Sequence, residues 1–202
     1  MEAGYRKEGR QNLVHFSCLV KPYRLRLEMS CKMMPEKDGP KQKSQTITWS
    51  YQVIEQNPAE SGLEYLLAIK DGRIPPPPVW NLIGCRLAEI RDGCVTLEVT
   101  PAEYHYNRFG VVQGGILCTI LDASMACTLS SSLPRGTGFS SPEIKVNYFR
   151  PVTIETGILS CESTIIHKGS RIAVLEGKIL DTEDRLYAQS MATFMIFVHS
   201  YR

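Results

Sequence analysis

The chain has 202 residues, of which 43% are hydrophobic and 22% charged, a composition that suits one packed domain with an appendage. The net charge of +2 gives no reason to expect nucleic acid or a membrane surface as the main partner. The charge is unevenly spread, because residues 1–44 carry a net charge of +5 and residues 45–202 a net charge of −3.

The cysteine pattern indicates the cellular compartment in which the protein works. There are seven, and none forms a C-x-x-C pair, which argues against a structural zinc site. Cys118 and Cys127 fall in an apolar run, where a free cysteine behaves as a small hydrophobic residue. We therefore expect a reducing, cytoplasmic setting and no metal. The first residues show no apolar signal segment, and the longest apolar run is interrupted by Asp122, so no membrane helix is expected.

Residues 1–44 predict an irregular, basic N-terminal extension. They contain three prolines and many charges and show no sustained hydrophobic period. A short apolar run at 13–20 could add a strand, but a disordered tail is the simpler interpretation. We expect the domain to span 45–202 and to fold without the extension.

In chain order, residues 61–72 predict a short helix with an apolar stripe and a stop at Gly72. The prolines at 75–78 predict a stiff extended connector. Residues 84–100 alternate between apolar and polar on both sides of Asp92-Gly93, which is typical of a β-hairpin with a two-residue turn.

Residues 114–129 predict a helix that is apolar nearly all round and therefore buried on all sides. Long strands separated by short turns are expected to follow, at 139–150, 156–167, 170–181 and 185–198. Their alternation is typical of a half-covered antiparallel sheet. The fold class predicted is α+β, with an antiparallel sheet of about six strands wrapped around one long helix.

Asp122 is the strongest catalytic candidate. It lies in the middle of the apolar helix, and burying a carboxylate without partners is costly. Such a group is expected to face a cavity, to find partners or to titrate at a raised pKa. The alternative is a structural aspartate that pairs within the fold.

Gly114-Gly115 opens the same helix. Glycines there let a ligand approach free backbone N–H groups, which can stabilise an oxyanion. Asp122 lies eight residues further, about 12 Å along a helix, too far for both to act on one carbonyl. Two antiparallel copies of the helix would bring Gly114 of one chain to Asp122 of the other, so the spacing predicts a homodimer with shared sites. The alternative is a tight helix entry with no chemical role.

Other motifs are weaker. His105 lies in a predicted loop and Ser141 at the start of a long strand, positions that are usually structural or solvated. There is no Gly-x-Ser-x-Gly elbow, phosphate-binding loop, dinucleotide fingerprint or His pair at metal-binding spacing. No cofactor is therefore expected.

Taken together, Asn107, Gln113-Gly114-Gly115, Asp122 and the segment 141–151 resemble the hotdog acyl-CoA thioesterases of the phenylacetate-degradation (PaaI-like) type. The similarity also covers Trp49, the 61–72 helix, the proline connector and the closing strands, and thus spans about residues 45–202.

The resemblance implies a thioester hydrolase that assembles as a dimer, often as a tetramer, and takes coenzyme A as part of its substrate. It gives Asp122 the role of general base or nucleophile and Gly114 that of polarising the thioester carbonyl. Asn107 positions the reacting groups and Ser141 assists across the site; Gly115 and His105 are further substrate-contact candidates.

The sequence departs from the family at one position. Gln113 stands where a His usually precedes the two glycines, and an amide can donate a hydrogen bond but cannot transfer a proton. Two alternatives therefore remain beside the hydrolase: a hotdog hydratase or dehydratase, with His105 as its acid/base, and a non-catalytic acyl-CoA binding protein.

Overall fold

The computed structural model describes residues 42–49 and 61–198. The chain divides into two compact units, residues 1–43 and 44–202, and the fold below is that of the second unit. The expected irregular extension, including the apolar run at 13–20, lies outside the described residues.

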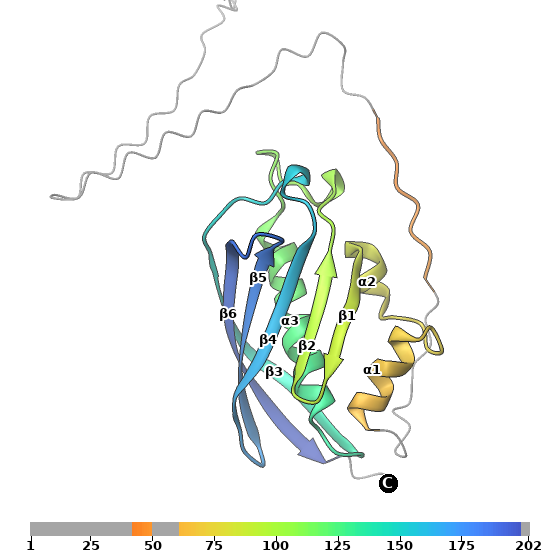
Figure 1. The fold of residues 1–202 in the computed structure, drawn as a ribbon, viewed down its shortest axis with the longest axis vertical. Helices are drawn as coiled ribbons and strands as arrows, with labels where there is room; N and C mark the ends of the chain where they lie inside the picture. The colour runs from red at the N-terminus through yellow and green to blue at the C-terminus, as the bar shows by residue number, and fades with distance from the viewer. Residues whose placement is uncertain (1–41, 50–60, 199–202) are drawn as a thin grey trace, which may run out of the picture. The chain divides into compact units, whose positions relative to one another are not determined.

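The described residues form three helices and six strands (Figure 1). The helices are α1 (Gly62–Lys70), α2 (Pro78–Ile83) and α3 (Gly114–Ser131), and two 3₁₀ turns, η1 (Glu103–His105) and η2 (Ile154–Thr156), lie in the loops. The strands are β1 (Cys85–Arg91), β2 (Cys94–Val99), β3 (Thr137–Tyr148), β4 (Leu159–Lys168), β5 (Ile172–Asp181) and β6 (Leu186–Val198).

All six strands form one antiparallel sheet in the order β1-β2-β4-β5-β6-β3. The sheet curves around α3, while α1 and α2 lie beside β1 (Figure 1). The predicted α+β class and the six strands around one long helix are confirmed. The strand order depends on β3, which follows α3 in the chain but pairs with the last strand, β6, and so becomes one edge of the sheet.

The first helix begins and packs for local reasons. Ser61 and Glu64 form a capping box, in which the Ser61 N–H donates to the Glu64 carboxylate (2.7 Å) and the Glu64 N–H to the Ser61 hydroxyl (3.3 Å). Gly62 lies directly against α3: a Cβ there would stand 2.0 Å from the Ser130 carbonyl oxygen. Only glycine permits α1 to approach α3 so closely.

The proline connector ends earlier than expected. Pro78 is the first residue of α2, the helix position where a missing N–H costs nothing. The helix ends at Ile83 and is capped by Gly84, which adopts a left-handed conformation with φ of 64°. A six-residue helix is too short to be stable alone, so the packing of its buried residues Trp80 and Ile83 stabilises it.

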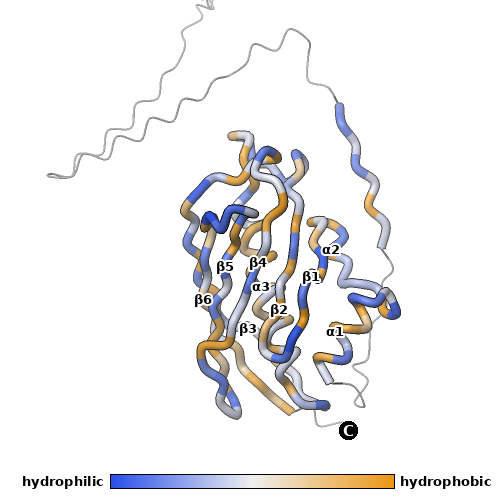
Figure 2. Tube along the Cα trace, viewed as in Figure 1, coloured by the Kyte–Doolittle hydropathy of each residue, from blue (hydrophilic) through white to orange (hydrophobic). Residues whose placement is uncertain are grey.

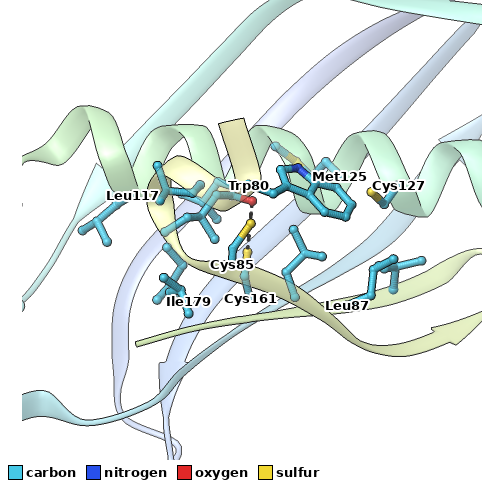
Figure 3. Close-up of a cluster of buried hydrophobic side chains, with 14 of the residues drawn as sticks. Trp80, Cys85, Leu87, Leu117, Met125, Cys127, Cys161 and Ile179 are labelled. Carbon is cyan, nitrogen blue, oxygen red and sulfur yellow. Dashed lines mark hydrogen bonds between the residues drawn. The ribbon is translucent and has the colours of Figure 1, made fainter. Parts of the chain in front are cut away.

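The core lies between α3 and the inner face of the sheet. Leu121, Met125 and Leu129 on α3 are fully buried. Figure 3 shows how side chains from α2, β1 and α3 converge there. The Cys161 thiol, on β4, donates to the Ile120 carbonyl (3.7 Å). Hydrophilic residues instead fill the turn between β5 and β6 (Figure 2).

The two faces of α3 differ. By length and composition α3 could cross a membrane, yet half of it is buried inside the domain, as expected of a core helix. It is not buried on all sides, however: Gly115 is exposed and Asp122 and Ala126 are half-buried. The expectation of a helix buried all round is therefore wrong for the single chain, because the sheet covers only one face.

Candidate functional site

The N-terminus of α3 is held in place by backbone hydrogen bonds. The Gln113 N–H donates to the His105 carbonyl (2.9 Å), and the Val112 N–H donates to the Val152 carbonyl (2.8 Å). Tyr106 forms an isolated antiparallel bridge with Val112. The helix therefore starts at a fixed point between η1 and the segment that follows β3.

Gly114 and Gly115 are the first two residues of α3, where backbone N–H groups have no partner within the helix. In the part of the chain that the structure describes, no other group accepts from these two N–H groups. Gly114 also borders Tyr148, whose hydroxyl donates to the Gly114 carbonyl (2.9 Å). These two amides are thus available to bind a carbonyl or an oxyanion.

Asn107 lies in the loop just before α3. Its side-chain oxygen accepts a hydrogen bond from the Phe109 N–H (2.8 Å), and its backbone N–H donates to the Val111 carbonyl (2.8 Å). This turn occupies the oxygen and fixes which way the amide points. The Asn107 NH₂ group remains as a donor for a ligand.

His105 could be structural or solvated on the sequence alone, and the structure shows that it is buried. It ends η1, is only 3% exposed, and its Nδ1 accepts a hydrogen bond from the Ala102 N–H (3.1 Å). Burial lowers the pKa of His105, so the ring is neutral and carries its proton on Nε2. Nε2 has no partner among the described residues, which leaves one buried donor unsatisfied.

Gln113 is the residue that caps α3. Its backbone carbonyl accepts from the Ile116 N–H (2.9 Å), while its side chain is exposed and makes no capping hydrogen bond. The amide is therefore free to turn toward a ligand at the helix start.

Asp122 projects from the half-exposed face of α3. Within the described ranges, its carboxylate takes part in no hydrogen bond or ion pair. Cys118 lies one turn earlier, and burial together with the Asp122 carboxylate raises the pKa of that thiol. Cys118 therefore stays protonated beside an aspartate that the single chain leaves without a partner.

Ser141 lies in the exposed part of β3, at the irregularity in register between Ser140 and Glu143. Tyr148, at the end of the same strand, touches Gly114. Ser141 lies seven residues earlier, roughly 20 Å along an extended strand. The structure therefore separates Ser141 and Asp122 from Gly114 within one chain.

A cavity of about 330 Å³ opens beside the start of α3. Its walls are Val111, Val112, Gly114, Leu117, Tyr148, Phe149, Arg150, Pro151 and Val152. Sequence reasoning missed Tyr148 and Arg150 as site residues, although both lie in the segment 141–151 that carries the family resemblance. Across the described residues, no group of three His, Cys, Asp or Glu side chains could hold a metal ion.

Comparison with known proteins agrees with this geometry. Residues 109–188, which include α3 and most of the sheet, match the thioesterase superfamily. A conserved protein of Pseudomonas aeruginosa has the same fold, with 29% identity and a TM-score of 0.57 over 60% of this chain and 95% of that one.

Two further proteins are similar. A phenylacetic acid degradation-related protein of Ralstonia eutropha superposes with a TM-score of 0.59 at 23% identity, over 65% of this chain and 98% of its own. A protein of Saccharolobus solfataricus named as an esterase is 23% identical over 58% of this chain and 82% of its own. Fold and family match together confirm the resemblance to the hotdog thioesterases of the phenylacetate-degradation type.

Proposed function

We propose that the chain hydrolyses acyl- or aryl-CoA thioesters to a carboxylic acid and coenzyme A. The observation that supports this most directly is that α3 carries both hydrogen-bond donors and a carboxylate without partners among the described residues. Two free amides stand at its start, and a free carboxylate stands eight residues further along the same helix. The first can stabilise a developing oxyanion and the second can act on water or on the carbonyl.

In this proposal the Gly114 amide donates to the thioester oxygen, with Gly115, Asn107 and the Gln113 amide as neighbouring donors. Asp122 either takes a proton from the attacking water or attacks the carbonyl itself, forming an anhydride that water then cleaves. In both cases the carbon–sulfur bond breaks, the sulfur leaves as the thiol of CoA, and the acyl group leaves as a carboxylate.

The two groups meet only if two chains associate. Gly114 and Asp122 stand about 12 Å apart along one helix, so one chain cannot place both on one carbonyl. Among the described strands, β3 is at one edge of the sheet, and its Ile144 and Val146 are half-buried, features that favour pairing with a second copy. We therefore propose a homodimer with shared sites, in which Ser141 of one chain lies across from Gly114 of its partner; two dimers can form a tetramer.

The setting proposed is the cytoplasm, with no nucleic acid or membrane partner and no cofactor. The five cysteines of the described residues are all free thiols. Burial raises the pKa of Cys85 and of Cys161 to about 12, so neither is a reactive thiolate.

The experiment that tests this function is a panel of acyl- and aryl-CoA substrates assayed for free thiol. Thiol release above the spontaneous rate supports the hydrolase. A change in enoyl absorbance without thiol release would instead identify a hydratase, although the neutral, buried His105 makes a poor acid for that reaction. Sedimentation gives the second measurement: an active monomer would contradict the shared site.

A non-catalytic acyl-CoA binder is the remaining alternative, and Gln113 is the observation that favours it. The family's usual His can be restored by Gln113→His, whose side chain is exposed and free to change without repacking. A rise in kcat would show that Gln113 limits a real hydrolase. If both the wild type and Gln113→His bind acyl-CoA without turnover, the protein is a non-catalytic acyl-CoA binder.

A further inference from the structure

Tyr148 is held against the start of α3. It lies at the end of β3, on the same face as the half-buried Ile144 and Val146, because alternate residues of a strand share a face. Its backbone pairs with Ala188 of β6. Its hydroxyl donates to the Gly114 carbonyl (2.9 Å), and its ring would stand only 3.2 Å from a Cβ added to Gly114. Both the ring and the hydroxyl are therefore fixed relative to the first turn of the helix.

The Gly114 carbonyl belongs to the same planar peptide group as the Gly115 N–H, because a peptide bond joins the carbonyl of one residue to the nitrogen of the next. A hydrogen bond to that oxygen draws electron density away from the nitrogen and makes the N–H a stronger donor, an effect of about 10–30% per bond. The Gly115 N–H is one of the two amides without an acceptor among the described residues. The Tyr148 hydroxyl thus acts on the Gly115 amide, although the atom that it touches belongs to Gly114.

The Tyr148 hydroxyl has one proton, and the Gly114 carbonyl receives it. Burial, with a smaller effect of Cys118, raises the pKa of Tyr148, so the hydroxyl keeps this proton at neutral pH. The side chain also lines the cavity beside α3, between Gly114 and the segment that follows β3. A ligand in that cavity meets the Tyr148 ring directly, but the hydroxyl proton acts on it only through the helix.

We propose that Tyr148 is a positioning residue of the oxyanion site, which orients and strengthens the Gly115 N–H as a donor to the thioester oxygen. This inference rests on the proposed function and gives Gly115 a larger share of the stabilisation. The oxygen carries more negative charge in the transition state than in the bound thioester, so a stronger donor stabilises the transition state more. The Tyr148 hydroxyl should therefore affect kcat more than KM.

The test uses the full chain and the variant Tyr148→Phe, which keeps the ring against Gly114 and removes only the hydroxyl. Tyr187→Phe is the matched control, because the buried Tyr187 hydroxyl donates to the Asp181 carboxylate (3.0 Å), an acceptor in the β5–β6 hairpin and not in α3. Thiol release from butyryl-CoA gives kcat and KM, and thermal melting gives the stability of each variant.

The expected fall in kcat follows from the strength of one donor. Loss of a whole oxyanion donor typically lowers kcat by about 10²–10³. Losing about 10–30% of one donor's effect should therefore lower kcat about two- to eightfold in Tyr148→Phe, with KM within about twofold and little change in Tm. Tyr187→Phe should do the reverse: Tm falls because the buried Asp181 loses a donor, and kcat stays unchanged.

A second measurement follows the carbonyl of a bound ligand. The probe is S-(2-oxopentyl)-CoA, a ketone that resembles butyryl-CoA but has no thioester to hydrolyse, with carbon-13 at its carbonyl. A stronger hydrogen bond lowers the carbonyl stretching frequency, which isotope-edited infrared spectroscopy measures. We expect a lower frequency on the wild type and on Tyr187→Phe than on Tyr148→Phe.

The proposal is overturned if Tyr148→Phe keeps either kcat or the carbonyl frequency at its wild-type value, or if Tyr187→Phe changes both equally. A fall in kcat beyond about tenfold would also overturn it, because the hydroxyl would then act on the substrate directly. If the wild type binds the ketone but releases no thiol, the hydrolase fails, and the frequency difference alone decides the role of Tyr148. A wild type that neither releases thiol nor binds the ketone contradicts both proposals.

Discussion

The two faces of α3 both carry polar side chains, but those on the buried face are hydrogen-bonded within the fold and, among the described residues, Asp122 on the half-exposed face is not. On the buried face, the hydroxyls of Ser124, Thr128 and Ser163 of β4 form a closed cluster: Ser163 bonds Thr128 (2.6 Å) and Ser124 (2.9 Å). Thr128 also accepts from the Val95 N–H (3.1 Å). On the half-exposed face, Asp122 has no partner among the described residues.

The difference shows which polar groups stabilise the fold and which remain available to bind a ligand. A buried hydroxyl is retained only where it is satisfied, and this cluster ties α3 to β2 and β4. The Asp122 carboxylate makes no such hydrogen bond within the described residues of the single chain. The buried face is therefore structural, and we infer that the half-exposed face is completed by substrate and by a second chain.

The largest effect should come from Asp122→Asn, which keeps the shape and removes the charge. We expect kcat to fall by about 10²–10⁴, the usual range for losing a general base. The free energy of unfolding should hold or rise, because no contact within the chain is lost. Thiol release and thermal melting measure the two quantities; near-normal turnover would make Asp122 a structural residue.

The complementary change on the buried face is Thr128→Val, which should cost about 1–3 kcal/mol of stability because the Val95 N–H and the Ser163 hydroxyl lose a partner. Turnover per folded molecule should stay unchanged. Thr119→Val makes the same replacement on the other face, where the Thr119 hydroxyl donates to the Gly115 carbonyl (2.9 Å) and has no other partner among the described residues, and should change stability little. Equal losses in the two variants would remove the distinction between the faces.

The two glycines at the start of α3 allow a sharper comparison. A Cβ at Gly114 would press on the Tyr148 ring, whereas one at Gly115 would meet nothing within 4 Å. Gly114→Ala should therefore shift the amide or the ring and lower kcat/KM, up to about tenfold. Gly115→Ala should fold as well as the wild type or better by about 0.4–1 kcal/mol. If both variants behave alike in the thiol assay, Tyr148 does not define the site.

The smallest effect concerns pH. Because burial lowers the pKa of His105, the unfolded chain binds this proton more tightly than the folded one. Stability should therefore fall as the pH drops through about 6.5, by at most about 1.4 kcal/mol per pH unit from this group. His105→Gln should remove that slope between pH 7.5 and pH 5, as measured by denaturant unfolding, and His167→Gln serves as a surface control. An unchanged slope in His105→Gln would mean that the ring titrates normally.

Much of the fold could be predicted from local patterns. The β1–β2 hairpin and the four long strands follow from alternation and turn residues, and every predicted strand lies within three residues of its observed ends. The helix α2 could not be predicted, because six residues with a proline at the start depend on the packing of Trp80. Likewise, nothing local to His105 signals that it is 3% exposed.

For the site, the sequence was enough to predict the chemistry along α3: glycines that free two amides, a carboxylate eight residues further, and a distance between them that one chain cannot close. These features depend only on the residue types and their spacing along one helix. Which residues from distant segments meet that helix could be seen only in the folded domain. Tyr148 packs on Gly114, β6 holds Arg150, and Ser141 lies away from the amides, because strand order is set by burial and pairing across the whole sheet, which no local pattern encodes.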